Sequence, residues 1–242
     1  MSTIRVRRSR PSPIALALAL MLTMFFVYAI SLSGPDKADK ADDADARLPS
    51  TAEVRMEGMD VSFLCAERVS DPLEARIRAS YCDQQGGAGL ILPDGSEYAI
   101  ILEAVSDPDA AGGIRRSAEG LTLKLKGDAA EIAAVSGAVD FLRAQAAETG
   151  ALAAALETGG SDAASVRALL EVYRTQGEKV LSALADCGES SSGTIKLFRA
   201  AVDGCVERLN AAIADTDPAS LRLIHAAACA QWLQLLTELP KA

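Results

Sequence analysis

The stretch Val-Ser-Asp-Pro-Leu-Glu-Ala at residues 69–75 returns as Val-Ser-Asp-Pro-Asp-Ala-Ala at residues 105–111. Five of the seven positions are identical, and a short apolar run precedes each stretch, at residues 61–67 and 97–103. Self-similarity of this kind indicates one supersecondary unit used twice. Each unit is predicted to be a strand, a capped turn, a helix and a second strand.

The Asp-Pro pair within each stretch is typical of a helix start. The Asp carboxylate can accept a hydrogen bond from an unpaired backbone N–H, and proline at the first helical position loses no intrahelical donor. Val69 and Val105 precede these caps, where a hydrophobic staple can form. The alternative is that two helices simply begin with the same common chemistry, since Asp217-Pro218 occurs without the rest of the pattern.

The segments around the repeat complete a small sheet. We expect strands near residues 60–66, 88–92, 98–104 and 121–126, with a helix at residues 72–85 and a short helix from Pro108 to Gly112-Gly113. Residues 121–126 alternate between apolar and polar side chains, so one face of the sheet is covered and the other meets water. The order β-α-β-β-α-β is the split βαβ, or ferredoxin-like, arrangement. It predicts a domain at residues 58–127 with both helices on one face and the opposite face open.

From residue 128 to residue 242 the apolar period becomes helical. Apolar side chains recur at spacings of three and four, and the pattern is broken at residues 159–162, 188–193 and 215–218. Such spacing with short loops is typical of an antiparallel helical bundle. The whole chain is therefore predicted to be α+β.

The amino terminus has the pattern of a membrane anchor. Residues 1–13 form a basic tail, and residues 14–33 contain no charge. Twenty helical residues span about 30 Å, the thickness of a bilayer core. Arginines before the span stay in the cytoplasm, so the rest of the chain is predicted to lie outside it. The alternative is a cleaved signal peptide, although its apolar region is normally shorter. Residues 34–57 are polar and acidic and are predicted to be a disordered linker.

The distribution of charge bears on the class of partner. The whole chain has a formal net charge of −9, and the four arginines of residues 1–34 contribute +4, so residues 35–242 carry −13. An acidic body without a basic stripe argues against nucleic acid as a partner.

The two strand–turn–helix units around residues 69–75 and 105–111, with the β-hairpin at residues 92–97 between them, resemble the SPOR domain of bacterial division and sporulation proteins. Many such proteins cross the membrane once and carry the module outside the cell. The resemblance implies binding to the glycan strands of peptidoglycan, above all septal strands stripped of peptide stems. The chain departs from the family where members often carry a Gln and then a Gly, because it has Cys65 and Glu67 there, and Glu103 at the matching Gly of the second half.

If a glycan binds, the open face of the sheet is expected to hold it. Alternation along the strands assigns five residues to that face: Phe63, Cys65, Ile101, Thr122 and Lys124. Phe63 offers an aromatic surface for a sugar ring, and Lys124 offers a donor for hydroxyl or carboxylate groups. The alternative is that Phe63 and Ile101 pack against the helical tail, because an apolar face invites cover.

The sequence carries little that indicates catalysis, and we predict no enzyme, no cofactor and no metal. His225 and Cys229 stand one helical turn apart, but no third ligand is visible, which favours a structural histidine. Glu67 and Glu103 could form an acid–base pair of the glycosidase kind, although solvated strand ends are the simpler interpretation. The five cysteines match no disulfide framework and are interpreted as small buried hydrophobes, with Cys65–Cys82 pairing left open.

Two main hypotheses follow. In the first, a non-catalytic single-pass envelope protein binds septal or spore-related peptidoglycan, and its helical tail binds division or sporulation proteins. In the second, the helical tail covers the sheet and the chain is a membrane-anchored scaffold that binds proteins only. Solvent exposure of Phe63 and Ile101 favours the first hypothesis, and burial under the helices favours the second. A wall hydrolase that uses Glu67 and Glu103 is a more distant third option.

Overall fold

The computed structural model describes residues 50–107, 110, 112–187 and 193–239 of the 242-residue chain. The transmembrane helix predicted at residues 14–33 lies outside these ranges. Within them, no helix is long and apolar enough to cross a membrane. The described residues all belong to one compact unit.

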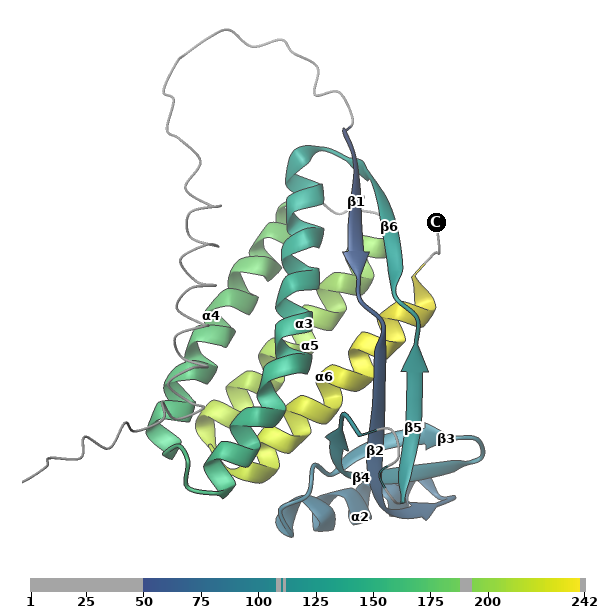
Figure 1. Cartoon of the computed structure of the whole chain (residues 1–242), viewed down its shortest axis with the longest axis vertical. Coiled ribbons are helices and arrows are strands. Elements are labelled where there is room, and N and C mark those ends of the chain that lie inside the picture. Colours follow the sequence, from purple (N-terminus) through teal and green to yellow (C-terminus); the bar gives the residue numbers. More distant parts are fainter. Residues whose placement is uncertain (1–49, 108–109, 111, 188–192, 240–242) are drawn as a thin grey trace, which may run out of the picture. The chain divides into compact units, whose positions relative to one another are not determined.

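The described chain is α+β, as the sequence predicts, with strands first and a run of helices after them (Figure 1). The first half contains β1 (Ser50–Met56), β2 (Met59–Val69), α2 (Pro72–Gln84), β3 (Leu90–Asp94), β4 (Glu97–Val105), β5 (Gly113–Ala118) and β6 (Leu121–Gly127). The second half contains α3 (Ala129–Glu157), α4 (Ala163–Asp186), α5 (Gly193–Ala214) and α6 (Pro218–Glu238). Strand β1 lies within the stretch whose composition predicts a linker.

The strands form two antiparallel sheets. One has four strands in the order β3-β4-β2-β5, and the other pairs β1 with β6. Because β1 leads into β2 and β5 leads into β6, the pairings β1–β6 and β2–β5 follow one another along a long ribbon (Figure 1). The ladder stops after the Met56–Leu121 pair and resumes at the Met59–Ala118 pair.

Two glycines explain why the ladder is interrupted. A Cβ atom on Gly58 would lie 2.8 Å from the carbonyl oxygen of Ala118, and one on Gly120 would lie 2.7 Å from that of Met56. No side chain fits at such distances, so the two backbones approach this closely only because both residues are glycine. The ladder of the two-stranded sheet ends there, and that of the four-stranded sheet begins.

The first repeat folds as predicted. Asp71 accepts hydrogen bonds from the backbone N–H groups of Leu73 and Glu74, each at 2.8 Å, and Pro72 is the first residue of α2. The inner side of α2 packs on one face of the four-stranded sheet around the buried Ile100, through Ala75, Ala79 and Cys82.

The second repeat does not fold like the first. Only residues 106–112 connect β4 to β5, and the helix predicted from Pro108 is absent among the described residues 106, 107, 110 and 112. Gly112 has a φ of 79°, and β5 begins at the next residue. Strand β5, which the sequence did not predict, takes the place beside β2. The predicted fourth strand is β6, but it pairs with β1 instead.

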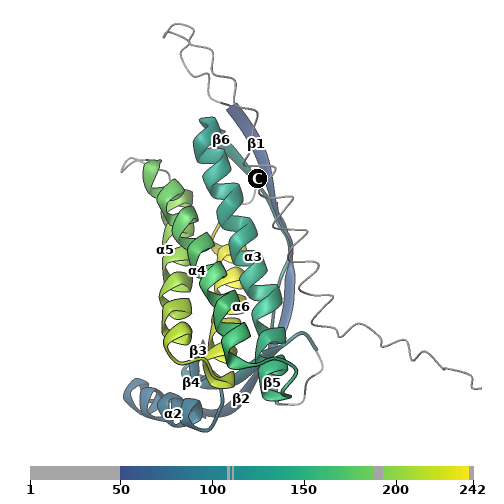
Figure 2. The same ribbon diagram turned by 90° about the vertical axis from the view of Figure 1, so that its left-hand side faces the viewer.

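Helices α3 to α6 form the predicted bundle, in which α3 and α5 each contact α4 and α6 (Figure 2). Asp128, Asp162 and Asp217 cap the starts of α3, α4 and α6, and Gly159, with a φ of 68°, follows the end of α3. The bundle core consists of fully buried large side chains from all four helices, including Leu142, Leu170, Phe198, Leu209, Leu221 and Leu236.

Helix α6 also packs against the four-stranded sheet. Its residues Ala226, Ala228, Cys229 and Leu233 share one buried apolar cluster with residues of β2 and β4. These mostly small side chains let the helix approach the strands closely. The sheet is therefore covered on both faces, by α2 on one and by α6 on the other, and the prediction that one face is open is wrong.

Candidate functional site

Three of the five residues predicted to bind glycan lie together, beneath α6. Phe63 on β2 and Ile101 on β4 each have no exposed surface, and both belong to the cluster with Cys229 of α6. Cys65 is half-buried and packs against the same cluster. In this structure Phe63 and Ile101 cannot contact a glycan, because the helix occupies the space in front of them.

The other two predicted residues, Thr122 and Lys124, lie in a different sheet. They are part of β6, where they stand opposite Arg55 and Glu53 of β1. Lys124 is exposed, whereas Thr122 is half-buried. The structure therefore does not bring the five predicted residues into one site, because β6 pairs with β1 in the two-stranded sheet.

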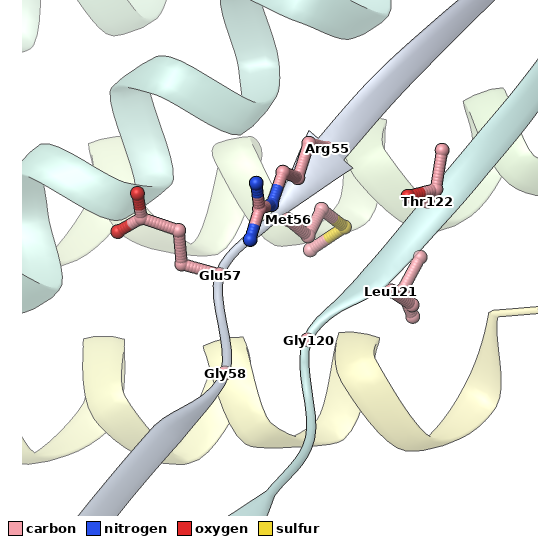
Figure 3. A pocket seen from close by; sticks show the side chains of 7 residues that line it. All are labelled: Arg55, Met56, Glu57, Gly58, Gly120, Leu121 and Thr122. Atoms are coloured by element: carbon pink, nitrogen blue, oxygen red, sulfur yellow. The ribbon is translucent and has the colours of Figure 1, made fainter.

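A pocket of about 510 Å³ lies where the ribbon is interrupted (Figure 3). Figure 3 shows Arg55 and Glu57 on the β1 side of this pocket and Leu121 and Thr122 on the β6 side. Its two charged side chains have opposite signs and are exposed to solvent. None of its lining residues is a buried polar side chain, so the pocket lacks the convergent polar groups that mark a ligand site.

Two helices of the bundle hold the backbone and side chain of Glu57 beside this pocket. The indole Nε1 of Trp232 donates a hydrogen bond of 3.0 Å to the carbonyl oxygen of Glu57, which has no ladder partner. Arg143 of α3 forms a long ion pair of 3.9 Å with the Glu57 carboxylate. The Trp232 hydrogen bond gives the Glu57 carbonyl a partner where the ladder is interrupted. This supports a structural role for the region.

A buried polar group links α3 to α6. The hydroxyl of Thr149 lies 3.4 Å from Nδ1 of His225, and Nε2 of His225 lies 3.9 Å from Sγ of Cys229. Burial lowers the pKa of His225 from its ordinary value and raises the pKa of the Cys229 thiol to about 12. The histidine is therefore neutral and the thiol protonated at neutral pH, which suits packing rather than acid–base work.

His225 and Cys229 have no third candidate ligand beside them among the described residues. Within the described ranges, no group of three or more His, Cys, Asp or Glu residues could hold a metal ion. The described cysteines are all free, with Cys82, Cys205 and Cys229 buried and Cys65 and Cys187 half-buried. In particular, Cys65 and Cys82 do not form a disulfide here.

Glu67 and Glu103 are ion-paired with different helices. Glu67 pairs with Arg78 of α2 at 3.8 Å, and Glu103 pairs with Arg222 of α6 at 3.6 Å. Glu67 stands opposite Ile100 in the ladder, and Glu103 stands opposite Leu64, so three residue positions separate the two acids. They do not form the close pair that a glycosidase needs.

Sequence reasoning missed an exposed apolar stripe on α2. Leu73, Ile77 and Tyr81 are 66%, 63% and 60% exposed, and they are spaced four residues apart on the outer side of the helix. Residues at this spacing share one helix face. The signal was present in the sequence, but the same helix also carries a second apolar side, and nothing local says which of the two meets the sheet.

No family model, no curated protein and no solved structure matches this chain.

Proposed function

We propose that this chain is a non-catalytic scaffold of the bacterial cell envelope, anchored once in the membrane, which binds another protein through its folded region. The anchor is the uncharged stretch at residues 14–33. The observation that most supports this proposal is the burial of Phe63 and Ile101 beneath α6. With α2 on the opposite face, the sheet then has no open face to which a glycan could bind.

The order β3-β4-β2-β5, antiparallel throughout, supports a ferredoxin-like origin for the sheet. In a split βαβ fold the first and third strands are central, as β2 and β4 are here. We infer that this is a divergent SPOR-like module whose second crossover has been reduced to a short connection. The bundle then supplies the cover that the second helix does not.

The contacts of Arg222 support a sheet that stays closed. This side chain of α6 donates a hydrogen bond of 2.5 Å to the carbonyl oxygen of Gly86 and forms a 2.5 Å ion pair with Glu157 of α3. It also pairs with Glu103 of β4. One guanidinium thus joins the strands, the loop after α2 and two bundle helices, and the charge-assisted bonds are of the stronger kind.

A protein-binding role requires an exposed surface, and α2 provides one. Its outer stripe of Leu73, Ile77 and Tyr81 is solvent-exposed, and contiguous exposed apolar surface marks interaction sites. Helices with anchors four residues apart are a recurring mode of protein recognition.

The test compares two binding assays on the full chain in detergent. We expect the chain not to sediment with amidase-treated peptidoglycan sacculi. We also expect a photo-crosslinker placed at Ser80 to form adducts with another protein chain. Ile77→Asp should abolish these adducts. Val172→Asp is the control and should preserve them, because it changes an exposed apolar residue of a different helix, α4. Retention on sacculi that is independent of the α2 stripe would overturn the scaffold and support peptidoglycan binding, with α6 moving away from the sheet.

A further inference from the structure

The outer side of α2 differs from an ordinary exposed helix face in two respects. The helix packs on the sheet through Ala75, Ala79 and Cys82. The three large apolar side chains on its outer side therefore contribute little to the stability of this fold. Figures 1 and 2 show α2 on the side of the four-stranded sheet away from α3 and α4. The stripe of Leu73, Ile77 and Tyr81 therefore remains available for a partner.

The charges beside the stripe are also unused. Arg76 and Asp83 are exposed and lie on the same flank of the stripe, one near each end of α2. Within the part of the chain that the structure describes, neither has an ion-pair partner, whereas Arg78 on the other flank pairs with Glu74 and Glu67.

These two charges fit a second copy of the same helix. Seven residues separate Arg76 from Asp83, which corresponds to about 10.5 Å along the helix axis. If two α2 helices pack antiparallel about a two-fold axis near Ser80, Arg76 of each lies opposite Asp83 of the other. Ile77 of each then meets Tyr81 of the other. A two-fold contact repeats each favourable pair, as isologous interfaces do.

We propose that α2 is a self-association surface, through which two copies of this chain pair as antiparallel α2 helices on the same membrane. The stripe is small beside the roughly 800 Å² that each partner buries in a stable complex. Pairing is therefore expected to be weak in solution, and shared anchoring strengthens it by raising the effective concentration. The inference rests on the proposed function for its anchor, and it names the partner of that function.

The first experiment uses the full chain in lipid vesicles. Ser80 is exposed and lies at the proposed axis, so Ser80→Cys should form a dimer with a short bismaleimide crosslinker. Ser182→Cys, an exposed serine of α4, is the matched control. The unsubstituted chain measures the background from the native cysteines. We expect at least tenfold more dimer from Ser80→Cys than from either control, and an equal yield would overturn the proposal.

The second experiment separates a second copy from a different protein. In the Ser80→Cys background, Arg76→Asp or Asp83→Arg alone places like charges opposite each other and should lower the dimer yield about tenfold. The double variant restores opposite charges on both sides of the axis, so the yield should return. A double variant as low as the single variants would overturn the antiparallel pairing.

Together, the two kinds of crosslinking at Ser80 distinguish failure of the self-association proposal from failure of the proposed scaffold function. If Ser80→Cys forms no homodimer while the Ser80 photo-crosslinker still labels a different protein in an Ile77-dependent manner, self-association is wrong and the scaffold stands. If neither adduct forms, both are wrong.

Discussion

Helices α6 and α2 cover opposite faces of one sheet, yet they relate to the rest of the molecule in different ways. Helix α6 lies between the sheet and the bundle, and its consecutive residues Ala226, Ala227, Ala228 and Cys229 are all buried. Helix α2 packs on one side only and exposes three large apolar residues on the other. Both helices carry apolar side chains on more than one side. The difference teaches that such a helix is a core element only when neighbours surround it, and is otherwise an interaction surface.

The largest expected effect that tests this comparison is chemical. Burial raises the pKa of Cys229 to about 12, against an ordinary value of 9.0. Its thiolate fraction at pH 8 is then about a thousandfold lower than that of an unperturbed thiol. We expect Cys229 to resist alkylation at pH 8, while a cysteine placed in α2 by Ile77→Cys reacts freely. Mass spectrometry of labelled peptides measures both, and equal labelling would break the comparison.

The second effect concerns stability. Phe63 is fully buried beneath α6, so Phe63→Ala should lower the free energy of unfolding by about 3–5 kcal/mol. Ile77→Ala removes an exposed side chain and should change it by less than about 0.5 kcal/mol. Trp232 is the chain's sole tryptophan and is 2% exposed, so its fluorescence during urea unfolding of the full chain measures both. Similar losses would show that α2 is covered in solution.

The third effect tests how closely α6 packs on α3. A Cβ on Gly150 would lie 2.8 Å from Nε2 of His225, whereas one on Gly137 would have only Val180 nearby, at 3.9 Å. Gly150→Ala should therefore destabilise the protein by about 1–3 kcal/mol, since overpacking strains the helix pair. Gly137→Ala should stabilise it by roughly 0.5–1 kcal/mol, because alanine favours helix interiors. Equal effects would mean that the α3–α6 interface is loose, which urea unfolding reveals.

The smallest effect concerns α2 itself. Asp71 is its N-cap, and Asp71→Ala should cost about 1 kcal/mol. Because α2 packs on one side, we expect this loss to appear as faster amide exchange within α2 rather than across the bundle. Asp71→Asn keeps a capping oxygen and serves as the control. Uniformly faster exchange would mean that α2 opens only with the whole protein.

Much of the described fold could be predicted from the sequence, because its signals are local. Asp-Pro with a preceding apolar residue predicted α2, and periodic apolar spacing predicted α3 to α6. The same Asp-Pro signal failed at its second occurrence. A cap only permits a helix, and the seven residues between β4 and β5 leave little room for one that also packs on the sheet.

The candidate site could be predicted only in part. Alternation correctly placed Phe63 and Ile101 on one face of the sheet. It failed next to Cys65, where two register shifts, one on each side of this residue, interrupt the pairing of β2 with β4. A bulge turns the residues after it toward the other face, and its position depends on the partner strand. Leu102 stands at one of these shifts, because Leu64 pairs with Glu103 and Cys65 pairs with Ile101, and it is 40% exposed.

The sequence by itself determined the class of the fold, the positions of the helices and the start of α2, because caps and periodicity act between residues close in the chain. Tertiary structure alone decided that α6 closes the sheet, that β6 leaves it to pair with β1, and that the outer side of α2 remains exposed. Those outcomes depend on which of several apolar surfaces meet, and burial of apolar area is non-directional. Competition among distant segments, rather than any local pattern, selects the pairs that form.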